Sequence, residues 1–441
     1  MAALSQTLAE LDALNALSEG LKERIDCYVA NARVAMETMA VAFEGEGEGE
    51  DGSEFKEPKA LRELKALKVD ASDSILVKKL ADLGILSKCL SVSTGDLELF
   101  ESLLPYADTS AANKAFELAS HGGHIAVVSR LLQDGRVDPS AQDNLAIQLA
   151  SQEGHAEVVK LLLEARDATG RLCVDPSANN NFSIETASQE GHLAVMKLLL
   201  EARDDSGRFR VDPSANGDQA IVKASEEGRI EVVKLLLEAR DDDGRLRVNL
   251  SAEESYAFRM ASRFGHLEVV KLLLEAHDDS GRLLVDPSAK DNEAIITAST
   301  NGHVAVVSRL LADPRVDPSA KDNEAIIDAS YFGHVAVVTR LLADKRVDPS
   351  ADNNHAIRYA SAGGHAEVVA LLLAHPRVDP SAKDNEAIID ASSNGHVAVV
   401  ALLLAHPRVD PSADDKRAFK WASLRGHVAV VALLQAHGLP S

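Results

Sequence analysis

Cysteine is scarce in this sequence. The 441 residues include only Cys27, Cys89 and Cys173, which are far apart and odd in number. This spacing provides neither a disulfide framework nor the paired thiols of a zinc site, and it is typical of a protein in a reducing compartment.

Long apolar runs are also absent. No stretch reaches the roughly 20 apolar residues that a membrane-spanning helix needs. The first residues, MAALSQTLAELDALNAL, have no basic region and carry acids among the leucines, so we expect no signal peptide. These absences predict a soluble intracellular protein in the cytoplasm, with a nuclear location left open.

Positive charge is in short supply. The chain has 46 Lys and Arg against 69 Asp and Glu, which gives a formal charge of −23. Nucleic acids and anionic membranes bind to clustered Lys and Arg, so this balance argues against both as partners. We expect a protein partner with a basic or apolar surface rather than an acidic one.

What the sequence does contain is a repeat, and a fixed period of this length determines the fold class. A Gly-His pair recurs at intervals of 31, then four of 37, then four of 31 residues, with Gly-Arg once. The second residues of these ten pairs are His124, His155, His192, Arg229, His266, His303, His334, His365, His396 and His427. A degenerate unit, GDLELFESLL (95–104), precedes them.

Each unit predicts two short helices separated by turns. In the unit around His334, Pro318 and the Asp322-Asn323 pair mark a turn, and either member of that pair can cap a helix over EAIIDASYF. Ala325, Ile326 and Ala329 are its expected buried face. Gly333 ends it, and HVAVVTRLLAD forms a second helix with Val335, Val338, Leu341 and Leu342 on one apolar stripe. Neither helix can bury its apolar face alone, so neighbouring units must stack.

The pattern G-H-x-x-V-V-x-L-L-L after a short A-S-x-x helix, followed by V-D-P-S-A, resembles the ankyrin repeat. The resemblance implies an all-α repeat solenoid of helix-turn-helix units joined by hairpin-like fingers. Two features depart from the family pattern: the units are shorter than the usual 33 residues, and Glu-Ala-Ile-Ile stands where Thr-Pro-Leu-His is usual. HEAT-like arrays of paired helices are the alternative, but they lack the Asp-Pro-Ser turn.

The chain divides into four predicted segments. Residues 1–43 are an amphipathic, coiled-coil-like helical segment that either oligomerises or packs on the array. Residues 44–56 are an acidic Gly/Glu linker, and 57–108 are a helical N-terminal cap with the degenerate repeat. Residues 109–441 form the array of ten units.

Four consecutive units carry six extra residues after the second helix. The segments begin at Ala165, Ala202, Ala239 and Ala276, and their Asp-x-x-Gly-Arg pattern predicts a reverse turn in a lengthened, β-like finger. Two interpretations stay open: a platform that displays Arg208, Arg210, Arg245 and Arg247, or a length variant with solvated charges.

The periodic histidines do not form a metal site in this interpretation. Metal ligands lie about 2 Å from one ion, whereas packed helices are roughly 8–10 Å apart. The resemblance instead implies that each histidine bonds the backbone of a neighbouring unit. G-x-S-x-G, H-E-x-x-H, phosphate-loop and kinase signatures are absent, so we expect no catalysis, no metal and no cofactor.

Aromatic residues make up only 4% of the chain, yet several gather at positions that vary from unit to unit. The resemblance implies that the two residues before each Gly-His pair face a partner on the concave side of the array, and the residue before each Ala-Ser varies too. Exposed aromatic and Arg side chains dominate binding hot spots. The predicted partner-binding residues are Tyr256, Met260, Arg263, Phe264, Thr300, Asn301, Tyr331, Phe332, Tyr359, Trp421 and Arg425.

The sequence thus supports three hypotheses. The first is a non-enzymatic scaffold or adaptor that binds a protein on the concave face. The second is a structural spacer assembled through the N-terminal helix, and the third is a regulator of an enzyme bound in trans.

Overall fold

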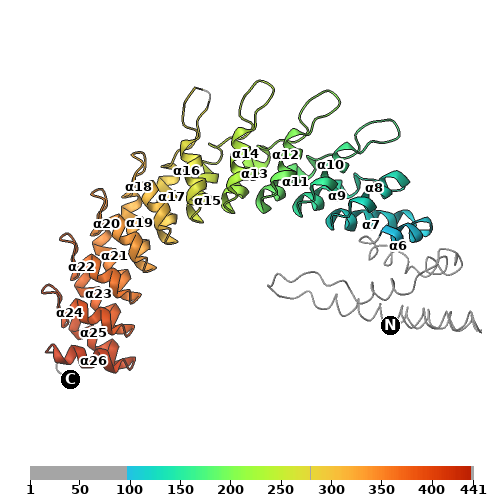
Figure 1. The fold of residues 1–441 in the computed structure, drawn as a ribbon. Coiled ribbons are helices and arrows are strands. Elements are labelled where there is room, and N and C mark those ends of the chain that lie inside the picture. The colour runs from blue at the N-terminus through green and yellow to red at the C-terminus, as the bar shows by residue number, and fades with distance from the viewer. Residues whose placement is uncertain (1–96, 279, 439–441) are drawn as a thin grey trace, which may run out of the picture. The chain divides into compact units, whose positions relative to one another are not determined.

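The computed structural model describes residues 97–278 and 280–438, in two compact units, Met1–Ala178 and Asn179–Ser441. The predicted helical segment (1–43), the acidic linker (44–56) and the first part of the predicted cap (57–96) lie outside the described residues. Each unit is a stack of helix pairs (Figure 1).

The first unit already includes the helix that precedes the first Gly-His pair. Its described elements are α6 (Leu97–Leu103), the 3-10 helix η2 (Leu104–Tyr106), α7 (Thr109–His121), α8 (Ile125–Asp134), α9 (Ala141–Gln152) and α10 (Ala156–Glu164). Helix α6 packs against α8, with Phe100 and Leu104 fully buried. The Asp108 carboxylate caps α7 by accepting the backbone N–H of Ala111 at 2.7 Å.

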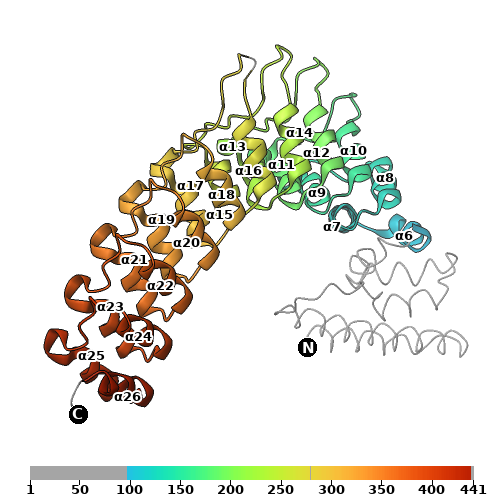
Figure 2. The same cartoon turned by 60° about the vertical axis from the view of Figure 1, so that its left-hand side comes forward.

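The second unit repeats the same pair eight times. Its helices are α11 (Ala178–Glu190), α12 (Leu193–Glu201), α13 (Ala215–Glu226), α14 (Ile230–Glu238), α15 (Tyr256–Arg263), α16 (Leu267–Glu275), α17 (Ala289–Thr300), α18 (Val304–Leu311), α19 (Ala320–Tyr331), α20 (Val335–Leu342), α21 (Ala351–Ala362), α22 (Ala366–Leu373), α23 (Ala382–Ser393), α24 (Val397–Leu404), α25 (Ala413–Leu424) and α26 (Val428–Ala436). First helices pack on first helices and second on second (Figure 2). The residues that the structure describes contain no strand, and the predicted all-α repeat fold is confirmed.

Burial within one pair follows the predicted periodicity in the first helix and shifts in the second. Ala325, Ile326 and Ala329 of α19 are fully buried, as predicted. In α20, Val337 joins Val338 and Leu341 in the core, whereas Val335 and Leu342 are only half-buried, so the predicted stripe is partly wrong. Each fully buried Val, Leu or Ile contributes about 1.5–3 kcal/mol. Because these side chains lie between successive pairs, stacking supplies most of the core.

Three successive residues near the start of the first helix adopt left-handed backbone angles. In α19 these are Lys321 (φ 49°), Asp322 (φ 55°) and Asn323 (φ 66°). The expected capping bond is not found at the start of α19; the Asn323 side-chain oxygen instead accepts the backbone N–H of Asp348, in the next pair, at 2.6 Å. Left-handed geometry costs roughly 1–2 kcal/mol for a residue with a Cβ, least for Asn and Asp. The cross-repeat bond offsets part of that cost.

The same asparagine-to-backbone bond recurs between successive repeats, and we call this series the asparagine ladder. The same bond joins Asn144 to Asp175 in the first unit, and in the second unit Asn181 to Asp212, Asn292 to Asp317, Asn354 to Asp379 and Asn385 to Asp410. Asp218 and Ser255 replace the asparagine in two pairs and accept the backbone N–H groups of Asn249 and Asp286.

Each Gly-His pair interlocks with the next one. Gly333 has φ 75°, and a Cβ on it would lie 2.5 Å from Nδ1 of His365. The Nε2–H of His365 donates to the backbone oxygen of Tyr331 at 2.8 Å. Because a carbonyl only accepts, the ring must carry its proton on Nε2. The same bond is made by His155, His266, His303, His334, His396 and His427.

The substitute arginine keeps the same connection. Arg229 donates its Nε–H to the backbone oxygen of Gln189 at 2.8 Å. The predicted structural role of these histidines, bonding the backbone of a neighbouring repeat, is therefore confirmed.

A third ladder, made of arginines, was not predicted. Arg346, which follows the second helix α20, donates to the backbone oxygens of Val316 (2.7 Å) and Leu311 (3.0 Å). The Asp344 carboxylate holds its guanidinium, and that hydrogen bond lowers the pKa of Asp344 below its ordinary value. Equivalent bonds join Arg315 to Val285, Arg377 to Val347 and Arg408 to Val378.

The four insertions form long closed loops, of which Figures 1 and 2 show those after α12, α14 and α16 along one edge of the second unit. An isolated antiparallel bridge closes each loop, at Arg166 and Leu172, Arg203 and Phe209, Arg240 and Leu246, and His277 and Leu283. A reverse turn at the tip is set by the first Asp: the Asp204 carboxylate accepts the backbone N–H groups of Ser206 (2.8 Å) and Arg208 (3.0 Å). The predicted finger is confirmed, without forming a regular strand.

Of the two interpretations of these fingers, the one in which they display four arginines is only partly correct. Arg208 and Arg245 are exposed, whereas Arg210 is half-buried. Arg247 donates to the backbone oxygens of Leu200 (2.8 Å) and Val211 (2.5 Å), and burial lowers its pKa. Its guanidinium carbon also lies 3.8 Å from the centre of the Phe209 ring, in the preceding finger. This arginine therefore joins neighbouring fingers instead of facing a partner.

Substituting Gly364 by Ala should destabilise the fold more than substituting Gly426 by Ala. Both glycines have left-handed angles (φ 78° and 75°), so each substitution costs about 1–2 kcal/mol of backbone strain. At Gly364 the new Cβ would also lie 2.5 Å from Nδ1 of His396, whereas nothing lies within 4 Å of it at Gly426. Thermal melts of both variants measure the difference, and adding His396→Ala to Gly364→Ala should recover part of it. Equal losses would show that the interlock is not a tight contact.

Asp218→Asn should stabilise the protein near neutral pH and less so in acid. Burial raises the pKa of Asp218 from 3.8 to about 6, opposed by the hydrogen bond from the Asn249 N–H, and Asp212 adds to the rise. A carboxyl with a raised folded-state pKa stabilises the fold below its unfolded pKa, and this contribution is lost as pH rises through about 6. The melting-temperature gain of Asp218→Asn over wild type should therefore grow between about pH 4 and pH 7. Asn323→Asp is the matched reverse substitution and should introduce the opposite trend; a gain that does not change with pH would contradict the assignment.

Candidate protein-interaction surface

The candidate surface lies at the ends of the first helices. The two residues before each turn glycine close the helix, while the glycine's left-handed angle sends the chain back into the second helix. Their side chains therefore point away from the core that the two helices share. The candidate surface extends from α15 to α25, within the second unit.

The structure exposes most of the predicted residues but not all of them. Exposed are Arg263, Phe264, Asn301, Tyr331, Phe332, Tyr359 and Arg425, and half-buried are Tyr256, Thr300 and Trp421. Met260 is only 5% exposed and belongs to the core beneath the surface, so its predicted place at the interface is wrong. Met260 occupies the position before the Ala-Ser pair, and in that repeat its large apolar side chain faces the core.

Tyr331, Phe332 and Tyr359 form one aromatic cluster. The rings of Tyr331 and Phe332 lie 4.8 Å apart, and those of Tyr331 and Tyr359 lie 5.3 Å apart, both edge to face. The three side chains remain 47%, 51% and 38% exposed. Edge-to-face pairs add about 0.5–1.5 kcal/mol beyond burial, so the rings hold one another in place while facing solvent.

The backbone under the aromatic cluster is held by the histidine ladder. His365 donates to the backbone oxygen of Tyr331, and the backbone N–H of Phe332 donates to the backbone oxygen of Asp328 at 3.0 Å. His355 packs on Tyr359 with ring centres 3.8 Å apart, and its Nδ1 lies 2.7 Å from the Asp352 carboxylate. A cluster fixed in this way loses little conformational entropy when a partner binds.

Carboxylates lie beside the aromatic cluster at a regular interval. Asp328, Tyr359 and Asp390 occupy the same position in three consecutive units, before the Ala-Ser pair. The Asp328 carboxylate accepts a hydrogen bond from the Thr300 hydroxyl at 2.8 Å. Burial raises the pKa of Asp390, and Glu386 raises it further, against the opposing charges of Arg358 and Arg417.

Two buried arginines were not predicted from the sequence. Arg259 forms an ion pair with Glu293, and Arg358 forms one with Glu386 at 2.6 Å, each joining a first helix to the next one. Both occupy a position that is Val or Ile in four other units: Val222, Ile296, Ile327 and Ile389. An arginine at this position, matched by a glutamate in the next repeat, was the available signal.

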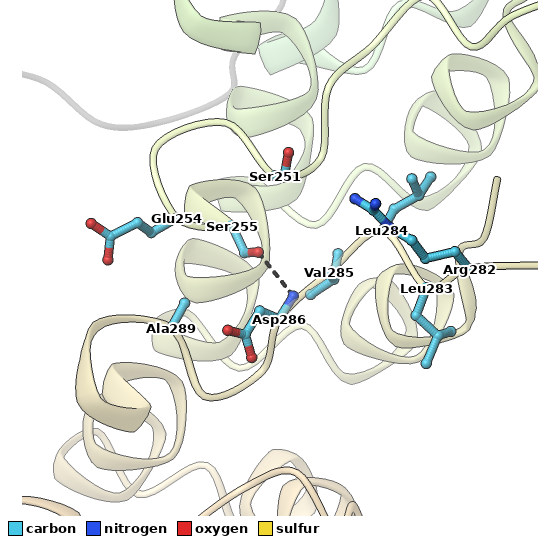
Figure 3. Close-up of a pocket in the computed structure, with 9 residues that line it drawn as sticks. All are labelled: Ser251, Glu254, Ser255, Arg282, Leu283, Leu284, Val285, Asp286 and Ala289. Carbon is cyan, nitrogen blue, oxygen red and sulfur yellow. Dashed lines mark hydrogen bonds between the residues drawn. The ribbon is translucent and has the colours of Figure 1, made fainter.

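A pocket lies away from this surface, at the base of the last finger (Figure 3). The Ser255 hydroxyl accepts the backbone N–H of Asp286 at 3.1 Å across it. Glu254, on its rim, is paired with Lys290 at 3.0 Å. None of the predicted partner-binding residues lines this pocket.

Metal sites and membrane spans are not found in the part of the chain that the structure describes. Across 97–278 and 280–438, no group of three or more His, Cys, Asp or Glu side chains is placed to hold a metal ion. Among the helices of these same residues, none is both long and apolar enough to span a bilayer.

The stacked helix pairs, their turn glycines and their histidine ladder define an all-α repeat solenoid. The family pattern described as "Ankyrin repeats (3 copies)" matches residues 88–171, 258–353, 295–384 and 357–439, and the chain belongs to the ankyrin-repeat family. The stretch between the first two matches, 172–257, lies among the units lengthened by six residues. No curated protein matches the sequence.

Removing both adjacent rings, in Tyr331→Ala with Phe332→Ala, should leave the melting temperature nearly unchanged. About half of each side chain already faces solvent, so little apolar burial is lost. Phe258→Ala is the contrast: that ring is 1% exposed, and its removal should cost about 3–5 kcal/mol. Thermal and denaturant unfolding measure both, and a loss in the double variant comparable to that of Phe258→Ala would place the rings in the core.

Proposed function

We propose that this chain is a non-enzymatic scaffold or adaptor that binds a protein partner on the ends of its first helices. Ankyrin repeats generally mediate protein–protein interactions, which supports the class of function. The observation that carries the proposal is the exposed cluster of Tyr331, Phe332 and Tyr359, because contiguous exposed rings on a rigid frame are typical of binding sites.

The proposed surface extends along neighbouring repeats on both sides of this cluster. Arg263 and Phe264 lie at the same turn position as Tyr331 and Phe332, as do Thr300 and Asn301 between them. Tyr256, Trp421 and Arg425 lie farther out. The cluster supplies the contact area, and these polar and cationic residues supply the rim expected of a protein interface.

The two other hypotheses have different consequences. A spacer assembled through residues 1–43 depends on a segment outside the described residues, and regulation in trans requires that the partner be an enzyme. The mass of the full chain in solution tests whether it assembles as a spacer. Identification of the captured partner tests whether that partner is an enzyme.

Affinity capture with the full chain tests the proposal. Tyr331→Ala with Phe332→Ala should lower the amount of a captured partner at least fivefold, since hot-spot residues contribute about 1–2 kcal/mol or more each. Leu283→Ala is the control, because that apolar side chain is 44% exposed but lies in a finger, outside the proposed surface. A partner retained equally by the double variant and by wild type would exclude the cluster as its binding site.

A further inference from the structure

Four described rings of the second unit, those of Phe209, Tyr256, Phe264 and Trp421, have arginines of the same chain over them. Arg203 and Arg247 lie 3.7 and 3.8 Å from the centre of the Phe209 ring. The guanidinium groups of Arg259, Arg263 and Arg425 lie 5.0, 5.7 and 5.5 Å from the rings of Tyr256, Phe264 and Trp421. All are within the about 6 Å range of a cation–π interaction.

The aromatic cluster of Tyr331, Phe332 and Tyr359 is different. In the part of the second unit that the structure describes, no Lys or Arg lies over any of these three rings. The nearest arginine in sequence, Arg358, is 8% exposed and is bound to the Glu386 carboxylate and to the backbone of its own repeat. Three exposed rings therefore lack the cation that the rings of Phe209, Tyr256, Phe264 and Trp421 have.

The charges around the aromatic cluster are those that would attract a cation. Asp328 and Asp390 flank Tyr359 at the same position in the preceding and following repeats. No ion pair within 4.0 Å is formed by either carboxylate with another described residue. Burial raises the pKa of Asp390, which a bound cation would reverse. A purely apolar partner would remove water from both carboxylates and bring no opposite charge in its place.

We propose that this cluster binds an arginine side chain of the partner protein, with the guanidinium over the rings and paired with Asp328 or Asp390. The inference rests on the proposed function and names the chemistry that its surface recognises. Arginine fits better than lysine because its planar guanidinium stacks on aromatic faces and loses its hydration shell more easily. The chain itself uses arginine in the cation–π contacts of Phe209, Tyr256, Phe264 and Trp421.

Calorimetric titration of the full chain with three matched peptides tests this proposal. The peptides are capped and glycine-rich and carry three arginines, three lysines or three citrullines; citrulline keeps the shape of arginine but has no charge. At physiological salt the arginine peptide should bind about three- to thirtyfold more tightly than the citrulline peptide, with the lysine peptide between them.

Substitutions then locate the binding site. Asp328→Asn with Asp390→Asn, and Tyr331→Ala with Phe332→Ala, should each remove most of the preference for arginine over citrulline. Phe209→Ala should keep it, since that ring lies in a finger outside the proposed surface and has its own Arg203 and Arg247. Circular dichroism of each variant confirms that a lost preference does not come from unfolding.

Two results would overturn the proposal. One is equal binding of the arginine and citrulline peptides; the other is a preference that survives both cluster variants, which would reflect general attraction to a chain of charge −23. If a captured partner depends on Tyr331 and Phe332 but the arginine peptide does not displace it, the scaffold function stands and the arginine site falls. If neither partner capture nor binding of the arginine peptide depends on the aromatic cluster, both proposals fall.

Discussion

The contact between each turn glycine and the histidine of the next repeat is the constraint on which the stack depends. The glycine is required twice: its left-handed angle reverses the chain, and its missing side chain makes room for the imidazole. The histidine then donates to a backbone oxygen that the reversed chain presents. A residue with a Cβ at the glycine would fail on both grounds, which explains why this pair recurs while its neighbours vary.

Two further ladders fix the remaining edges of each repeat. Asparagines near the start of the first helix accept a backbone N–H of the next repeat. Arginines after the second helix donate to a backbone oxygen of the preceding repeat. Repeats that carry all three residues are thus tied by side chain to backbone at three separate levels. Since none of these bonds uses the side chains at the ends of the first helices, that surface is left to vary. The exposed rings of Tyr331, Phe332 and Tyr359 are an example of this freedom.

The sequence predicted what is periodic and missed what is spatial. The helix pairs and the turn glycines followed from spacing, because every unit repeats them, and the role of the histidines followed from the family resemblance. The cross-repeat bond of Asn323 was mistaken for a helix cap, since both functions need the same residue at the same place. Met260 and Arg247 were assigned to the surface because composition does not reveal whether a side chain at a variable position faces the core or the solvent. The gathering of Tyr331 with Tyr359 required the distance between adjacent first helices.

The bonds between repeats also determine how the second unit would respond to a pulling force. Histidine, asparagine and arginine ladders connect each repeat only with the repeat beside it, so the load passes through them in series. Under tension the weakest junction would open first and leave the others intact. The junctions at Asp218 and Ser255, where the asparagine is replaced twice in succession, differ chemically from the others. In mechanical terms, the composition of this ladder makes the junctions of the second unit unequal.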